Sequence, residues 1–278
     1  MADLRYTFAR VLYGQPLSVT VAAIASKLAR RRASKVGAPL ASSPPVHPVD
    51  AFYGIETSGL ISPRRIRSDS PSDAFSIGYG GAQPSVLRAV LATIPDLERA
   101  CFLDVGCGKG RALAVATEFP FRRIVGVELS PDLARIAEKN AVVMASRFPD
   151  RTPIEVIEGD ALKFEMPAGY VVAFFHHPGF EPLVRGFAAR LAAHQTEAGN
   201  RVLLVYYNPA FGRIFDDDPA FARYYAGRHL LRPGEDSSNF GESEYTVVIW
   251  KSNFDPAPPH PGANAKIRAT ALNAVLET

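Results

Sequence analysis

Short apolar runs alternate with amphipathic stretches through the middle of this chain. Runs of five to seven residues with few polar positions are typical of strands that are buried on both faces of a parallel sheet. A spacing of three to four residues between apolar positions predicts helices between them. The predicted strands are 101–105, 123–129, 154–158, 170–176 and 201–207, and the predicted helices are 111–118, 131–147 and 181–194. This alternation predicts βαβ units, and hence an α/β domain with a doubly wound, mostly parallel sheet.

The pattern changes near the end of this region. Two further strands are expected at 228–232 and 245–251, with no helical pattern between them. A hairpin is the simplest connection of two such strands. It places one antiparallel strand in the sheet and brings the number of strands to seven.

Proline-rich segments divide the chain into three parts. Residues 37–50 are rich in Pro and Ser and have no periodicity, and 255–266 is a second proline-rich stretch. We therefore expect a helical extension and linker over 1–50, a folded domain over 51–254, and a tail over 255–278 that ends in a short helical pattern. No internal repeat of fixed period is visible.

Composition and charge restrict the partners and the compartment. A net charge of +3 is too balanced for a dedicated nucleic-acid-binding protein. The two cysteines, Cys101 and Cys107, offer neither a disulfide framework nor a zinc spacing, which fits a reducing cytoplasm. The apolar run 17–25 is too short to span a bilayer, and the basic residues directly after it disfavour export. An amphipathic helix, a cytoplasmic protein and no integral membrane segment are the expectation.

A glycine-rich turn follows the first predicted strand. The stretch 104–110 reads DVGCGKG, so that three glycines fall within five positions directly after the strand that contains Asp104. The turn lacks the GxxxxGK-[ST] pattern of a phosphate-binding P-loop, and it is GxGxG where a dinucleotide-binding turn has GxGxxG. An acid beside this turn is unfavourable near a pyrophosphate and favourable near a cation. The turn therefore predicts a positive or amphoteric ligand.

The stretch 104–110 resembles the first motif of the class I S-adenosylmethionine-dependent methyltransferases. The resemblance implies a Rossmann-like seven-stranded sheet with S-adenosyl-L-methionine as cofactor. It assigns Asp104 to the methionine part of the cofactor and Gly106 and Gly108 to the close approach of its backbone. It further assigns Glu128, after the second strand, to the ribose hydroxyls. By the same resemblance Asp160 contacts the adenine amino group, with Ala161 beside the ring.

The turn before the first strand has two interpretations. The motif is also similar to that of the seven-strand protein-lysine methyltransferases, in which a tyrosine-containing loop lies over the cofactor. By that analogy Tyr79 and Gln83 close over the methionine end. The alternative is a glycine-rich turn that caps a helix starting near Pro84.

The methyl acceptor is expected beside the fourth strand. Family members that methylate amide or exocyclic nitrogens have Asn or Asp followed by two prolines and an aromatic residue there, whereas this chain has HHPGF at 176–180. A neutral imidazole of His177 or His176 fits a general base, because its ordinary pKa lies near neutral pH. Tyr207, after the fifth strand, is a further pocket candidate. Packed histidines and a core tyrosine are the alternative, and no metal site is expected.

The resemblance thus implies an enzyme that transfers a methyl group from S-adenosyl-L-methionine to a nitrogen or oxygen of a small molecule. A protein-lysine N-methyltransferase and a non-catalytic cofactor-binding protein are the alternatives, and an NAD-dependent oxidoreductase is disfavoured by the GxGxG spacing. We expect no nucleic-acid partner. The first 50 residues fit a lid, a homodimer arm or a partner-docking helix.

Overall fold

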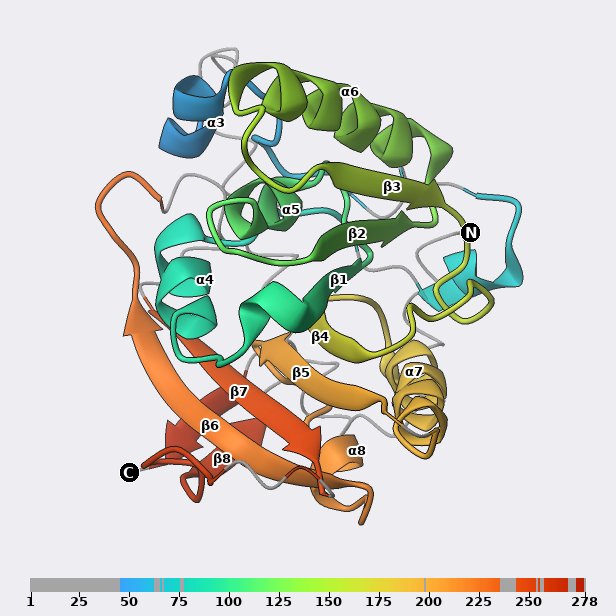
Figure 1. The fold of residues 1–278 in the computed structure, drawn as a ribbon, viewed down its shortest axis with the longest axis vertical. Coiled ribbons are helices and arrows are strands. Elements are labelled where there is room, and N and C mark those ends of the chain that lie inside the picture. Colours follow the sequence, from blue (N-terminus) through green and yellow to red (C-terminus); the bar gives the residue numbers. More distant parts are fainter. Residues whose placement is uncertain are drawn as a thin grey trace, which may run out of the picture.

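The centre of the molecule is a seven-stranded sheet (Figure 1). The structure, a computed structural model, describes residues 46–62, 66, 68–75, 78–197, 199–235, 244–253, 255, 258–269 and 274–277. The strand order is β3-β2-β1-β4-β5-β7-β6. The strands are β1 (Ala100–Val105), β2 (Arg123–Glu128), β3 (Ile154–Glu158), β4 (Tyr170–His176), β5 (Arg201–Tyr207), β6 (Phe221–Leu230) and β7 (Glu244–Ser252). Strand β7 runs antiparallel to both of its neighbours and the other pairings are parallel, which confirms the predicted sheet.

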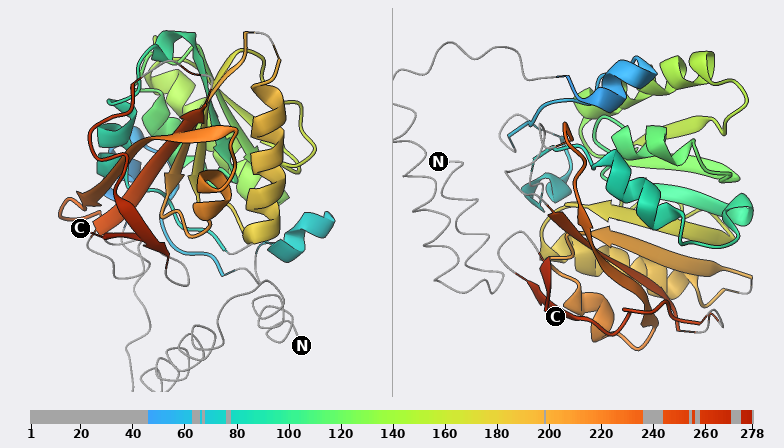
Figure 2. Two further views of the ribbon diagram at one scale, coloured as in Figure 1. Left: turned by 90° about the horizontal axis from the view of Figure 1, so that it is seen from below. Right: turned by 90° about the vertical axis from the view of Figure 1, so that its left-hand side faces the viewer.

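Helices cover both faces of this sheet. The helices are α3 (Pro48–Tyr53), α4 (Pro84–Leu91), α5 (Arg111–Ala116), α6 (Pro131–Arg147), α7 (Glu181–His194) and α8 (Arg213–Asp216), and short 3-10 turns are η2 (Pro71–Phe75) and η3 (Leu97–Arg99). Helices α4 and α5, with Ala137 of α6, belong to the core on one face, whereas α7 and α8 contribute to the core on the other. In the left panel of Figure 2 the teal α4 and the yellow α7 lie on opposite sides of the sheet. This is the doubly wound arrangement that the sequence predicts.

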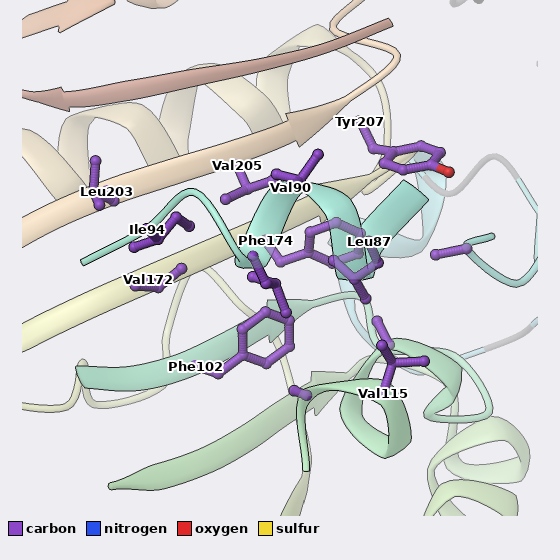
Figure 3. Close-up of a cluster of buried hydrophobic side chains, with 14 of the residues drawn as sticks. Leu87, Val90, Ile94, Phe102, Val115, Val172, Phe174, Leu203, Val205 and Tyr207 are labelled. Carbon is purple, nitrogen blue, oxygen red and sulfur yellow. The ribbon is translucent and has the colours of Figure 1, made fainter. Parts of the chain in front are cut away.

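Alternate residues of the central strands fill the two cores. Phe102 of β1 and Phe174 of β4 face α4 and α5, and their rings stack with centroids 5.9 Å apart. Figure 3 shows this cluster, in which Tyr207 lies at the end of the row that β5 contributes. Cys101 and Leu103 of β1 face the opposite core. Because β1 is buried along its whole length, its last residues before the glycine loop are held rigidly.

Most predicted elements have the bounds that the pattern gives. Helices α6 and α7 and strands β3, β4 and β5 coincide with the predicted ranges, and α6 begins as expected, with the Ser130 hydroxyl accepting from the Leu133 N–H and Pro131 in the first turn. Strand β6 begins at Phe221, seven residues before the predicted start at 228. It lies at the edge of the sheet, where polar side chains are tolerated, and a bulge between Arg223 and Tyr225 shifts the alternation. The first half of β6 therefore lacks the apolar pattern that predicts a strand.

The expected helical pattern at the end of the tail is wrong. Lys266–Ala269 (β8) and Ala274–Glu277 (β9) instead form an antiparallel pair. Strand β9 contacts β6 and β7, at the lower left of Figure 1, so tertiary packing overrides a weak local helical preference. The predicted N-terminal helix falls in residues 1–45, outside the described part of the chain. No helix in the described part has the length and apolar character that crossing a bilayer requires.

Candidate functional site

The glycine loop lies at the carboxyl ends of β1 and β2. The N–H groups of Gly106 and Cys107 donate to the carbonyl of Val127, at 2.9 and 3.1 Å, and tie the loop to β2. Gly108 has a φ of 57°, and a Cβ added there would lie 2.4 Å from Cδ2 of Tyr79. The backbone of the loop therefore needs glycine at 108 for both its conformation and its contact with the tyrosine ring.

Asp104 is a buried carboxyl group next to a second acidic side chain, Glu128. It lies at the end of β1 and is 4% exposed. Within the described part of the chain, no group donates a hydrogen bond to its side chain. Burial raises the pKa of Asp104 well above its usual range, and the neighbouring carboxylate of Glu128 raises it further. A cationic group bound here would interact strongly with the ionised carboxylate, because little water lies between them to screen the attraction.

Glu128 holds the glycine loop from the end of β2. One carboxylate oxygen accepts from the N–H of Gly108 at 2.7 Å and the other from the N–H of Ser130 at 2.9 Å. Burial raises the pKa of Glu128, and these N–H donors oppose that effect. With the Leu129 N–H these make three backbone donors, and a carboxylate has about four acceptor positions, so acceptor capacity remains for a hydroxyl donor.

Asp160 follows β3 and is held by a segment from far earlier in the chain. Its Oδ2 accepts from the hydroxyls of Ser70 at 3.0 Å and Ser72 at 2.8 Å, and its Oδ1 accepts from the N–H of Leu162 at 2.9 Å. Although burial acts in the opposite direction, these donors and Lys163 lower the pKa of Asp160. The carboxylate is therefore ionised and fixed in orientation. Its neighbour Ala161 is buried at the edge of the α7-side core.

Tyr79 lies against the glycine loop, and Gln83 is buried at the start of α4. The Tyr79 ring contacts the position of Gly108, its hydroxyl donates to the carbonyl of Thr57 at 2.6 Å, and the ammonium of Lys109 lies 5.6 Å from its ring centroid. Gln83 is fully buried at the start of α4, where its Oε1 lies 3.3 Å from Nε2 of His47. For Gln83 the structure thus favours the helix-start interpretation of this turn.

A buried polar network holds Thr57, whose carbonyl accepts the hydrogen bond from the Tyr79 hydroxyl. Thr57 is fully buried, its N–H donates to Asp50 at 2.8 Å, and its hydroxyl donates to the same carboxylate. The guanidinium of Arg111 donates to the hydroxyl and the carbonyl of Thr57, at 2.7 and 2.8 Å. Asn140 of α6 bonds both the N–H and the carbonyl of Glu56. Residues 50–58 are thereby fixed beside the glycine loop.

The two histidines lie at the end of β4 with their rings 4.9 Å apart. His177 has a φ of 51°, a backbone conformation that is unusual for a residue with a side chain and that is enriched at functional sites. Burial lowers the pKa of His177 to about 4. Burial, with His177 and Arg111 nearby, lowers the pKa of His176 well below its usual range. Both imidazoles are therefore neutral at neutral pH.

The end of β5 lies next to the histidines. The rings of Tyr207 and His176 have centroids 4.9 Å apart, and Tyr245 of β7 packs on Tyr207 at the same distance. Asn208 has a φ of 52°, so that both β4 and β5 end in a non-glycine residue with left-handed backbone. A Cβ added at Gly106 would lie 3.8 Å from Pro178, which places the glycine loop beside the loop after β4.

The structure thus places the predicted residues in two groups. Asp104, Gly106, Gly108, Glu128 and Tyr79 meet around the glycine loop, and His176 and Tyr207 meet at the ends of β4 and β5. Asp160 with Ala161 lies beyond β3, at the edge that η2 covers. Over the described ranges no three His, Cys, Asp or Glu side chains cluster in a way that could hold a metal ion.

Sequence reasoning missed the residues that support these groups. Thr57, Ser70 and Ser72 lie on segments without a periodic pattern or a motif, whereas Arg111 is the first residue of the predicted helix 111–118. Each of the four contacts a partner more than 50 positions away. The alternation of serine with acid and proline in 68–73 was the available signal. It indicates a turn, and does not identify the carboxylate that the turn contacts.

Comparison with known proteins agrees with this geometry. Residues 102–196 match a family model described as a methyltransferase domain. The match covers β1, the glycine loop and the elements through α7. This stretch of the chain is therefore similar to a methyltransferase domain. The chain is also 34% identical to the trans-aconitate 2-methyltransferase of Afipia carboxidovorans over 88 residues. These 88 residues make up 31% of this chain and 30% of the length of that protein.

Two solved structures resemble this chain in part. The RNA methyltransferase of Salinibacter ruber in complex with S-adenosyl-L-homocysteine is 19% identical, with a TM-score of 0.42 over 66% of this chain and 98% of that chain. Magnesium protoporphyrin IX methyltransferase of Synechocystis PCC 6803 with bound S-adenosylmethionine is 14% identical, with a TM-score of 0.42 over 60% of this chain and 76% of that chain. Neither similarity specifies an acceptor for this chain, and the expected absence of a nucleic-acid partner stays a prediction.

Proposed function

We propose that this protein is an S-adenosyl-L-methionine-dependent methyltransferase that acts on a nitrogen or oxygen of a small molecule. The observation that carries the proposal is the pair of buried carboxylates, Asp104 and Glu128, on either side of a glycine loop that leaves its backbone bare. A zwitterionic amino-acid end and a diol-bearing sugar on one molecule satisfy both carboxylates.

The methionine and ribose ends have distinct partners. The ammonium of the cofactor pairs with the ionised form of Asp104 in a desolvated position and thereby opposes the effect of burial on its pKa. A ribose hydroxyl donates to the remaining acceptor capacity of Glu128, which also accepts from the Gly108, Leu129 and Ser130 N–H groups. Gly106 and Gly108 let the backbone approach the ligand, and Tyr79 covers the loop from the opposite side.

The adenine end is assigned to Asp160 and Ala161. Oδ1 of Asp160 has one acceptor position beyond the Leu162 N–H, which suits one N–H of an exocyclic amino group. Ala161 offers a small apolar surface beside it. This assignment places the three parts of the cofactor along the carboxyl ends of β1, β2 and β3, where ligands bind in open α/β sheets.

The acceptor is assigned to the ends of β4 and β5. When bound, the sulfonium cofactor supplies an already activated methyl group, so the chain needs mainly to orient the acceptor and exclude water. A base with a pKa of about 4 removes protons poorly at neutral pH, so His177 accepts a hydrogen bond from the N–H or O–H of the acceptor and orients it. His176 and Tyr207 form the wall behind it.

The neutral histidines favour a small-molecule acceptor over a protein lysine. A lysine ammonium must lose a proton before it attacks, and neither imidazole has the pKa to take it. An acceptor that is already neutral or anionic at neutral pH needs no such base. The homodimer through the N-terminal extension, the cytoplasmic location and the absence of a nucleic-acid partner stay predictions.

Calorimetry with S-adenosyl-L-methionine, S-adenosyl-L-homocysteine and NAD tests the cofactor. We expect S-adenosyl-L-methionine and S-adenosyl-L-homocysteine to bind, and NAD to give no measurable heat of binding. Binding of NAD alone would replace the proposal with an oxidoreductase.

Incubation of the protein with methyl-labelled cofactor and a cell lysate, followed by separation of metabolites from proteins, then tests the acceptor class. Label in the metabolite fraction supports the proposal, label in protein supports a lysine methyltransferase, and cofactor binding without transfer supports a non-catalytic protein.

A further inference from the structure

The segment before β1 contacts the carboxylate that is assigned to adenine. Ser70 precedes η2 and Ser72 lies within it, and both hydroxyls point at Oδ2 of Asp160 across 90 and 88 positions of sequence. Ser72 is 7% exposed, so its hydrogen bond is made away from solvent. The segment is itself held, because η2 contacts α7 and the N–H of Asp73 donates to the Ser70 carbonyl at 3.0 Å.

The hydrogen bonds of Asp160 restrict how it can receive a ligand. A carboxylate oxygen has two acceptor positions, and the two serine hydroxyls fill those of Oδ2. Oδ1 receives one donor, the N–H of Leu162. The ammonium of Lys163 lies 3.9 Å from Oδ2 and is largely exposed, so it adds charge but little orientation. A ligand donor is thereby directed to Oδ1 alone.

We infer that Ser70 and Ser72 are positioning residues that make Asp160 selective for a purine with an exocyclic amino group. The inference rests on the proposed function and adds to it a specificity device that lies outside the glycine-loop motifs. With Oδ2 saturated, the carboxylate has a fixed plane and presents one acceptor position to the purine edge. A 6-oxo purine presents a carbonyl oxygen in place of the amino group. This oxygen and Oδ1 of Asp160 are both acceptors, so they form no hydrogen bond and binding is weaker.

Charge supports the same role. Asp160 can discriminate amino from oxo only while it is ionised, since a protonated carboxyl donates as well as accepts. The hydroxyl donors and the Leu162 N–H are the groups that stabilise the ionised form against burial, with Lys163 as the charged group that faces it. Removal of the two hydroxyls therefore both frees the carboxylate to rotate and raises its pKa.

The test compares S-adenosyl-L-homocysteine with S-inosyl-L-homocysteine, in which a 6-oxo group and a protonated N1 replace the 6-amino group and the unprotonated N1. Calorimetry with the full chain gives the ratio of their dissociation constants. We expect the native protein to prefer the adenine compound by roughly 10-fold to 100-fold, as one charge-assisted hydrogen bond supplies. The double variant Ser70→Ala/Ser72→Ala should lose most of this ratio, and Ser70→Thr, which retains the hydroxyl, should keep it.

Matched controls separate this role from a structural one. Ser68→Ala removes a hydroxyl of the same segment that accepts from the Ser70 N–H and does not contact Asp160, so its ratio should equal that of the native protein. Thermal denaturation identifies a variant that loses its fold. A double variant that binds both compounds more weakly with an unchanged ratio would overturn the inference, as would one that binds the adenine compound more tightly. Failure of the native protein to bind either compound would instead contradict the proposed function.

Discussion

The carboxylate of Glu128 accepts a hydrogen bond from the backbone N–H of Gly108 at 2.7 Å. This contact joins the end of β2 to the glycine loop that leaves β1. It makes the position of the loop depend on a residue that is also assigned to the ribose. Under the proposed function, loop geometry and sugar binding both depend on this one side chain.

Glu128→Gln is expected to weaken both functions. A glutamine side chain brings an NH₂ group against the N–H of either Gly108 or Ser130, so one hydrogen bond is lost and the loop is held less firmly. We expect roughly 10-fold to 100-fold weaker binding of S-adenosyl-L-homocysteine in calorimetry, from the loss of hydrogen bonds to a charged group. Glu158→Gln is the control, because Glu158 pairs in register with Glu128 on β3 but is exposed. Equal affinities of the two variants would contradict this account.

Gly108→Ala is expected to disrupt the loop through contact with Tyr79. The added Cβ would lie 2.4 Å from the tyrosine ring, in a backbone conformation with a φ of 57°. The conformation alone costs roughly 1–2 kcal/mol. Gly199→Ala provides the comparison, because Gly199 has a φ of 86° with nothing within 4 Å of an added Cβ. Denaturant unfolding should show a larger loss for Gly108→Ala, together with loss of cofactor binding. A loss no larger than that of Gly199→Ala would show that the ring moves away freely.

The two histidines are expected to stay neutral throughout the range near neutral pH. Because burial lowers the pKa of His177 to about 4 and that of His176 in the same direction, neither should gain a proton between about pH 8 and about pH 6. Nitrogen-15 NMR of the imidazole rings, assigned with His177→Asn and His176→Asn, measures this directly. Asparagine is chosen because it tolerates the left-handed backbone of position 177. Titration of either ring near its ordinary pKa of about 6.5 would restore a general base to the site.

Removal of the Asp104 charge is expected to stabilise the protein without ligand. A carboxyl whose pKa is raised by folding is ionised at lower pH in the unfolded chain, so it destabilises the fold at pH values above its ordinary pKa of about 3.9. Asp104→Asn should therefore raise the free energy of unfolding at neutral pH by ~1–3 kcal/mol. The melting temperature should rise by about 2–4 °C for each kcal/mol. Asp150→Asn, at an exposed position, should leave it unchanged. A lower melting temperature for Asp104→Asn would mean that the carboxylate stabilises the fold.

The elements of the sheet could be predicted because their signals are local. The apolar runs at β4 and β5 and the capping residues Ser130 and Pro131 of α6 mark their own boundaries. Strand β6 was only partly predictable, since its single partner leaves one edge free for polar residues and its bulge shifts the alternation. The C-terminal pair β8 and β9 depends on contacts with β6 and β7, which no local pattern contains.

The site also combines residues that a local motif identifies with residues that depend on contacts between distant segments. Asp104 and the glycines form a contiguous motif, so their meeting with Glu128 could be expected from the parallel order of β1 and β2. The hydrogen bonds of Ser72 to Asp160 and of Arg111 to Thr57 join segments 88 and 54 positions apart through irregular backbone. The histidine pKa values depend on burial in three dimensions, an effect that the ordinary pKa used for the general-base prediction does not include.

The affinity of S-adenosyl-L-homocysteine as a function of pH tests the central claim most directly, with 5′-methylthioadenosine, which lacks the amino-acid part, as the matched ligand. Because the ionised form of Asp104 pairs with the ligand ammonium and its pKa is raised in the free protein, affinity should increase from about pH 5 to about pH 8. Asp104→Asn should bind S-adenosyl-L-homocysteine roughly 10-fold to 100-fold more weakly at the upper end of this range, with a flatter pH profile and an unchanged affinity for 5′-methylthioadenosine. Native affinity and a native pH profile in Asp104→Asn would contradict the account.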